Sequence, residues 1–362
     1  RREEGLRHSS TWRKEQLGLE FPFRGYIDRP ERRAIRFRQL KMVMHHVARH
    51  CRYWIADPNR STGKPLDIDS VNLYHVNTWL IKPATNDKQC SFVELLTEEE
   101  QPPEWFISHW WGERIVSFMK CLDKHMQVRG LSVDTAYWVC AYANRQHALA
   151  LDIAENPRES SFFRAMLDSG GVLLVLDPKR KKSGPATPFQ RIWCDFEEAV
   201  AVDHTNHLIL DIATCLDNGS ASVLTAGVTK VDRQRAKERD TLSTRQKMLR
   251  ERTFPIDIID AGLQVRVQDG QASQDIDRLH ILNCLCGRPL NTVPLLAEHP
   301  EFDRVNGRLR AVFAVAAWRN ALHKGKVEAL RLPEVLSGDE WLTSLQLDLS
   351  DCIELMDADH VG

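Results

Sequence analysis

The chain has 362 residues, of which 43% are apolar and 27% are charged, and its formal net charge is −1. This length predicts two to three domains, and the near-neutral charge provides no field that would select nucleic acid. The longest apolar runs, Gly171–Leu176 and residues 311–318, are much shorter than the about 20 residues that cross a membrane. We therefore expect neither a membrane nor a specific nucleic-acid partner.

The cysteines bear on the cellular compartment. The nine cysteines are scattered singly, apart from Cys284 and Cys286, and their number is odd. Several lie within apolar periodic segments, which is typical of reduced thiols, so we expect a cytoplasmic location. The charged start Arg1-Arg2-Glu3-Glu4 is not a signal peptide, and without an initiator Met we expect a fragment.

Residues 1–103 are predicted to be an N-terminal extension that is basic at its start. Residues 1–60 carry 15 Lys and Arg against 7 Asp and Glu, which fits a solvated tail or, alternatively, contact with an acidic partner. We expect one helix over residues 32–54. The β-branched and aromatic residues of 71–81 predict a strand, and Pro102-Pro103 marks the boundary.

One pair of histidines in this extension has the spacing of metal ligands. His46 and His50 fall on one face of the predicted helix, and Cys51 follows them. The His-Glu-x-x-His pattern of zinc proteases is missing, so we expect structural or surface histidines and no metal site.

Residues 104–215 alternate between strand-like and helix-like segments, which is typical of an α/β domain. Strands are expected over residues 105–108, 136–143, 171–176 and 207–213, with helices from Ile115, over 147–154, over 160–167 and over 188–202. Gly171–Leu176 is the predicted central strand, because its Val-Leu-Leu-Val-Leu run is apolar throughout, as burial on both faces requires. Helices between strands predict a parallel sheet with helices on both faces.

The rest of the chain is predicted to be helical. Residues 216–253 are expected to be a linker whose stretch 230–252, with 9 Lys and Arg against 4 Asp and Glu, forms a solvated helix. Residues 254–335 are expected to be a helical region with amphipathic helices over 277–286 and 302–324. Residues 336–362 resemble the start of a leucine-rich repeat, and one copy implies an array that is cut off here.

Two segments contain candidate functional residues. Ser108, His109, Trp110 and Trp111 follow the first strand, at the edge where open α/β sheets bind ligands. An exposed indole there would stack on an aromatic ring; the alternative is that both tryptophans pack against helices.

The second segment is the helix over residues 188–202. On a helical wheel Phe189, Ile192, Trp193, Phe196 and Val200 form the apolar face. Glu197 lies at its border on the Trp193 side, with Asp195 on the opposite border and Glu198 on the solvent side. Glu197 is therefore predicted to be half-buried, either as a tuned carboxyl group or as an ordinary ion-pair partner.

Phe106-Ile107-Ser108, the central apolar strand and Trp193-Cys194-Asp195-Phe196-Glu197 occur in this order. Together they resemble the TIR (Toll/interleukin-1 receptor) domain, whose signature is Trp-Cys-x-x-Glu. The wider pattern, with His-Trp-Trp-Gly-Glu, is similar to an expanded family of microbial-eukaryote proteins. The resemblance implies a flavodoxin-like fold, and either NAD cleavage or a non-catalytic adaptor that acts by self-association.

For NAD cleavage, the resemblance implies that Glu197 is the catalytic residue and that NAD is the substrate, with no further cofactor. The residues expected to contact NAD are Ser108, His109, Trp110, Trp111, Trp193 and Arg191. Ser108, His109 and Glu197 should then converge at one sheet edge.

Two loops leave alternatives open. Residues 144–147 differ from the acidic, glycine-bearing loop of TIR domains, which leaves self-association open. Lys179-Arg180-Lys181-Lys182 fits phosphate contact, a nuclear-import signal or a solvated loop.

Overall fold

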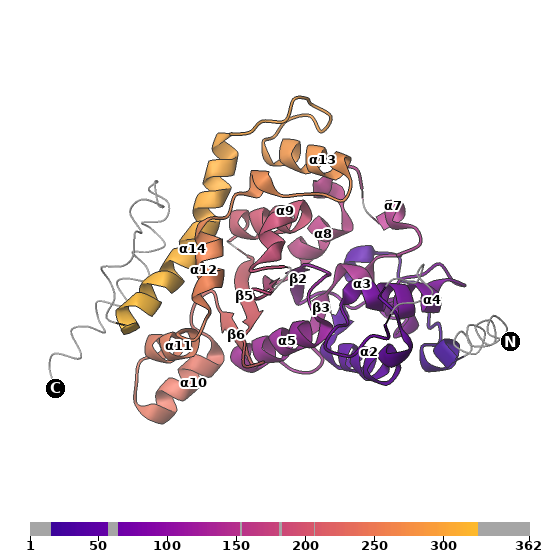
Figure 1. The fold of residues 1–362 in the computed structure, drawn as a ribbon, viewed down its shortest axis with the longest axis horizontal. Helices are drawn as coiled ribbons and strands as arrows, with labels where there is room; N and C mark the ends of the chain where they lie inside the picture. The colour runs from indigo at the N-terminus through magenta and orange to yellow at the C-terminus, as the bar shows by residue number, and fades with distance from the viewer. Residues whose placement is uncertain (1–15, 57–63, 153, 181–182, 206, 325–362) are drawn as a thin grey trace. The chain divides into compact units, whose positions relative to one another are not determined.

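The computed structural model describes residues 16–56, 64–152, 154–180, 183–205 and 207–324 (Figure 1). Over these residues the chain is a mixed α/β protein with a six-stranded mixed sheet, which confirms the predicted α/β class. The predicted leucine-rich segment 336–362 lies outside the described residues, as do residues 1–15 and Lys181-Lys182. None of the described helices is both long enough and apolar enough to cross a membrane.

The elements up to the third strand include several short helical turns. In chain order they are η1 (Pro30–Arg32), β1 (Ile35–Arg36), α2 (Phe37–His50), η2 (Cys51–Tyr53), α3 (Leu73–Val76), η3 (Asn77–Ile81), α4 (Lys82–Thr85), η4 (Val93–Leu95), β2 (Trp105–His109), α5 (Ile115–Arg129) and β3 (Ala136–Trp138).

The later elements end in a group of helices. They are α6 (Cys140–Ala143), α7 (Leu149–Asp152), η5 (Pro157–Glu159), α8 (Ser161–Asp168), β4 (Gly171–Leu176), η6 (Thr187–Gln190), α9 (Ile192–Asp203), β5 (Ile209–Cys215), β6 (Ala221–Leu224), α10 (Lys230–Arg239), α11 (Ser243–Glu251), α12 (Ile256–Leu263), η7 (Val267–Asp269), α13 (Asp275–Leu285) and α14 (Pro300–Lys324).

The sheet has the strand order β1-β3-β2-β4-β5-β6. Strands β2 and β3 are parallel, as predicted, whereas the edge strands β1 and β6 are antiparallel to their neighbours. The edge at β6 differs from the predicted parallel sheet because only a short turn connects it to β5. In that turn the Leu216 N–H donates to the Ser220 carbonyl at 2.8 Å, and Gly219 has a φ of +78°. So short a connection permits antiparallel pairing only.

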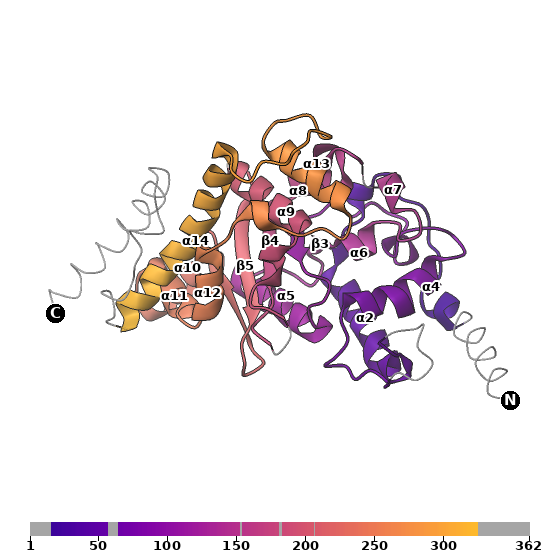
Figure 2. The same ribbon diagram turned by 45° about the horizontal axis from the view of Figure 1, so that its top comes forward.

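Strand β4 is buried at all six positions. Its residues after Gly171 are branched and apolar, so both faces of the strand exclude water. In Figures 1 and 2, helices α5 and α9 lie on opposite sides of the strands.

The predicted strand over residues 71–81 is wrong, because α3 and η3 make this segment helical. Leu73, Val76 and Leu80 are among the buried apolar residues there, and their spacing of three and four is helical. The Asn72 side chain accepts from the His75 N–H at 3.1 Å and caps the first turn. The predicted strand over 136–143 likewise ends at Trp138, and α6 follows it.

The predicted solvated linker helix over 230–252 is instead two helices, α10 and α11. They are joined by a buried ion pair in which Arg250 Nη2 lies 2.9 Å from Asp232 Oδ2. The Asp232 and Arg250 side chains are 0% and 5% exposed, so this segment belongs to the packed structure.

The chain divides into two compact units. Unit 1 comprises the described residues up to Ile107, with Trp111–Val116 and Ser132–Gly171. Unit 2 comprises Ser108–Trp110, Ser117–Leu131 and the described residues from Val172 onward. In unit 1 the rings of Phe106 and Trp138 stack at 5.2 Å. In unit 2, α9 packs against η7, α13 and α14 as well as β5.

Candidate functional site

The candidate site in unit 2 begins at the end of β2. Ser108 and His109 are the last residues of this strand and are 0% and 8% exposed. The His109 ring lies 4.7 Å from the Phe118 ring, centroid to centroid. Ser108 Oγ and both ring nitrogens of His109 have no hydrogen-bond partner among the described residues. Burial lowers the pKa of His109 to about 4, so the imidazole is neutral near pH 7.

Helix α9 supplies the second part of the site. Pro188 lies in the η6 turn that leads into α9, and Arg191 occupies the N-cap position with extended backbone. From Cys194 to Val202 every residue of α9 is buried. The prediction that Glu198 faces solvent is therefore wrong. The helix is covered on its outer side by η7, α13 and α14, which follow it by more than sixty residues.

Glu197 lies beside the end of β2. Its carboxyl group is close enough to the Ser108 hydroxyl for that hydroxyl to lower its pKa, although no hydrogen bond of normal geometry joins them. Desolvation is the larger effect and raises the pKa of Glu197 to about 8. Cys194, one turn earlier, faces the same hydroxyl, and burial raises the pKa of its thiol. The structure thus brings together Ser108, Cys194 and Glu197.

Two further carboxyl groups, those of Asp195 and Glu198, lie on the same turn of α9. Both side chains are 0% exposed, and none of their oxygens has a hydrogen-bond partner among the described residues. Burial, together with repulsion between neighbouring carboxylates, raises the pKa of each well above its usual range. Asp195 also packs directly against the backbone of Gly270, where a Cβ atom would overlap its carboxylate.

The segment 267–277 of unit 2, which we call the cover, forms hydrogen bonds with two of the residues predicted to bind NAD. Trp193 Nε1 donates to Asp277 Oδ2 at 3.1 Å, and Arg191 Nη2 donates to Ser273 Oγ at 3.2 Å. Gln271 adds two backbone bonds, from its N–H to Gln190 and from the Ile192 N–H to its carbonyl. Arg191 and Trp193 are therefore engaged within the protein.

The two adjacent tryptophans are both half-buried. Trp111 belongs to unit 1, where its Nε1 donates to Cys140 Sγ at 3.1 Å and its ring lies 5.6 Å from that of Tyr74. These contacts match the alternative in which a tryptophan packs against neighbouring elements. Trp110 belongs to unit 2 together with Ser108 and His109.

The loop after β4 is anchored by Asp177. Its carboxylate accepts from the Thr187 N–H at 2.6 Å and from Thr187 Oγ1 at 2.8 Å. Arg180, from the basic run, donates to Ser117 Oγ at 3.3 Å. In unit 1 the side chain of Asn144 accepts from Ser161 Oγ at 2.9 Å, so the loop that differs from TIR domains is tied to α8.

Sequence reasoning missed Asp195 and Glu198 as parts of the buried cluster. The available signal was the density of acidic residues, with three carboxyl groups in four positions of an otherwise apolar helix. It also missed Gly270, whose close approach to Asp195 cannot be read from local sequence.

No family model matches the chain, and neither a curated protein nor a solved structure is significantly similar to it.

Proposed function

We propose that this chain is a TIR-like enzyme that cleaves the nicotinamide–ribose bond of NAD, with Glu197 as its catalytic residue. The observation that carries the proposal is the approach of Ser108 to Glu197, residues that are far apart in sequence. Ser108 and His109 end β2, and strand ends are where open α/β sheets bind nucleotides.

The strand order supports a flavodoxin-like assignment of the fold. The inner strands lie in the order β3-β2-β4-β5, which along the chain is the second, first, third and fourth of them. Flavodoxin-like sheets have the order 2-1-3-4-5. The antiparallel β6 occupies the place of the fifth strand, which is a departure from that pattern.

The proposed chemistry needs one carboxylate. The nicotinamide of NAD is cationic, so when its bond to the ribose carbon breaks, the electron pair goes to the ring nitrogen and neutral nicotinamide leaves. The ribose passes through an oxocarbenium-like state, which a negative Glu197 stabilises electrostatically. Water then adds to the ribose carbon and releases a proton.

The raised pKa of Glu197 couples this chemistry to substrate binding. With a pKa of about 8, most of the carboxyl groups carry a proton at neutral pH before NAD binds. A cationic nicotinamide ring within about 4–6 Å favours the ionised form. Substrate therefore helps to generate the carboxylate that the reaction requires.

The burial of Glu197 favours the second candidate function, a non-catalytic adaptor that acts by self-association. Glu197 is 5% exposed, and the cover holds Trp193 and Arg191. For Arg191 and Trp193 to contact NAD the cover has to release them, so in the enzyme it acts as a lid. In the adaptor it is a permanent part of the fold.

Nicotinamide release from NAD by the purified chain tests the proposal. It is measured at high protein concentration, because TIR domains often require assembly for cleavage. We expect turnover by the wild type and none by Glu197→Gln. A folded wild-type chain that releases no nicotinamide would leave the adaptor.

A further inference from the structure

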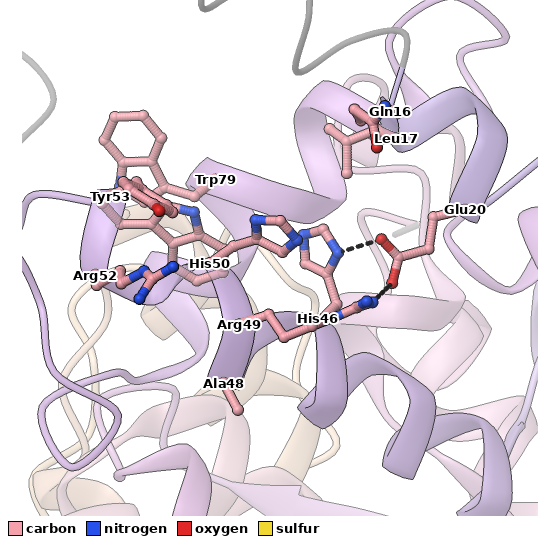
Figure 3. Close-up of a pocket in the computed structure, with 11 residues that line it drawn as sticks. Gln16, Leu17, Glu20, His46, Ala48, Arg49, His50, Arg52, Tyr53 and Trp79 are labelled. Carbon is pink, nitrogen blue, oxygen red and sulfur yellow. Dashed lines mark hydrogen bonds and ion pairs between the residues drawn. The ribbon is translucent and has the colours of Figure 1, made fainter.

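A pocket of about 680 Å³ lies in unit 1, separate from the α9 cluster of unit 2 (Figure 3). Its wall combines aromatic and charged side chains from residues 16–20, the end of α2 and the segment after it. The residues that line it include Glu20, His46, Arg49, His50 and Trp54.

Three side chains at this pocket have the chemistry of metal ligands. His46 and His50 are one helical turn apart on α2, and Glu20 approaches them from residues 16–20 (Figure 3). One potential ligand atom from each residue lies within 4.8 Å of the others. His46 Nδ1 is 2.9 Å from Glu20 Oε2.

We propose that Glu20, His46 and His50 bind a zinc ion, with one coordination position left open toward the pocket. Two imidazoles and one carboxylate are a ligand set that zinc takes in catalytic sites, where a water or substrate completes the tetrahedron. Bonds of about 2.0–2.1 Å place tetrahedral ligands about 3.4 Å apart. Glu20 Oε2 and His46 Nδ1 are 2.9 Å apart and the three candidate atoms lie within 4.8 Å of one another, so reaching that spacing takes side-chain shifts of roughly 1 Å.

The surroundings hold the ligands in place. His46 is 4% exposed, and its ring lies 5.4 Å from that of Phe21 and 6.4 Å from that of Trp54. The second oxygen of Glu20 accepts from Arg49 Nη2 at 2.7 Å. Zinc-bound carboxylates usually have such a hydrogen-bond donor on the oxygen that faces away from the ion.

An ion pair between Glu20 and a protonated His46 is the competing explanation. That pair involves two of the three side chains, and the His50 ring centroid lies 4.4 Å from that of His46 at an interplanar angle of 32°. A divalent cation would be shared by both rings and the carboxylate.

Zinc titration of the metal-free full chain, followed by isothermal calorimetry, tests this site. The variants are His50→Ala and Glu20→Gln, and the matched control is His45→Ala, an exposed histidine on the same helix. We expect one zinc ion per chain for the wild type and the control. Binding should be at least about 100-fold weaker in each ligand variant, because each removes one of only three ligands.

Two results would overturn the site. One is a wild-type chain that binds no zinc. The other is zinc binding that persists unchanged in both ligand variants, which would place the zinc elsewhere in the chain. Glu20 and His50 are only partly buried, so both variants are expected to fold, and a thermal melt of each verifies this.

Discussion

At the scale of single residues, the main feature of α9 is its group of three buried carboxyl groups, those of Asp195, Glu197 and Glu198. All three are buried, and no cationic side chain among the described residues lowers the pKa of any of them. Each therefore favours its protonated form. The sequence predicts Glu197 at the edge of an apolar face, and in the structure it is 5% exposed and lies beside Ser108.

Replacing Glu197 by Gln should stabilise the protein at alkaline pH. Folded Glu197 keeps its proton up to about pH 8, whereas the unfolded chain loses it near 4.5. Between these values the folded state binds more protons, so the free energy of unfolding falls as pH rises. The rise in pKa corresponds to at most roughly 5 kcal/mol.

Urea denaturation of the wild type and Glu197→Gln at about pH 4 and about pH 8.5 measures this effect. We expect similar stability at the lower pH and a more stable variant at the higher pH. Equal stability at both values would mean that Glu197 is ionised and solvated in the folded protein.

The same pKa predicts the pH profile of nicotinamide release. In the proposed reaction the carboxylate form is the active one, so we expect kcat/KM to rise with pH through about 8. A profile that is already flat from about pH 6 would show that a group other than Glu197 carries the reaction.

At the scale of elements, the sequence predicted those segments whose own residues carry a clear pattern. The apolar run of β4 and the helix α9 were both found, because burial on two faces and a 3.6-residue period are local signals. The helical segment 71–81 was missed, since branched and aromatic residues also occur in buried helices. The burial of Glu198 was missed because the elements that cover it lie far along the chain.

The contact between α12 and α14 in unit 2 gives a sharp stability test. A Cβ atom at Gly262 would lie 2.3 Å from the Phe313 ring, whereas one at Gly307 of α14 would meet nothing within 4 Å. We expect Gly262→Ala to destabilise the protein by about 1–3 kcal/mol through overpacking. Gly307→Ala should stabilise it by about 0.5–1 kcal/mol through helix propensity. Urea denaturation measures both, and equal effects of the two changes would contradict the close contact.

The hydrogen bond between the cover and Trp193 offers a test of the proposed lid. Asp277→Ala removes the acceptor of the Trp193 indole, a bond worth about 1 kcal/mol. If cover opening limits turnover, nicotinamide release should rise about fivefold. Asp275→Ala, an exposed neighbour in the same first turn of α13, is the control and should leave the rate unchanged. A loss of activity in Asp277→Ala would show that the cover supports the site.

For the whole molecule, the α/β class could be predicted because strands and helices alternate over residues 104–215. The antiparallel edges could not, since β1 pairs with a strand about a hundred residues away and β6 depends on a tight turn. The zinc ligands show the same limit. His46 and His50 are visible as a pair, but Glu20 lies 26 residues before His46, with no local signal to link them.

Assembly is the property of the whole molecule that the TIR-like proposal predicts. We expect the specific rate of nicotinamide release per chain to rise with protein concentration, together with the mass measured by light scattering. A constant specific rate with a monomeric mass at every concentration would contradict a requirement for self-association.

The decisive measurement of Glu197 as the catalytic residue is nicotinamide release by the wild type, Glu197→Gln and Glu198→Gln, followed side by side at high protein concentration. Both variants remove a buried carboxyl group from the same turn of α9, but only Glu197 lies beside Ser108. We expect turnover by the wild type and Glu198→Gln and none by Glu197→Gln. Full turnover by Glu197→Gln would contradict it.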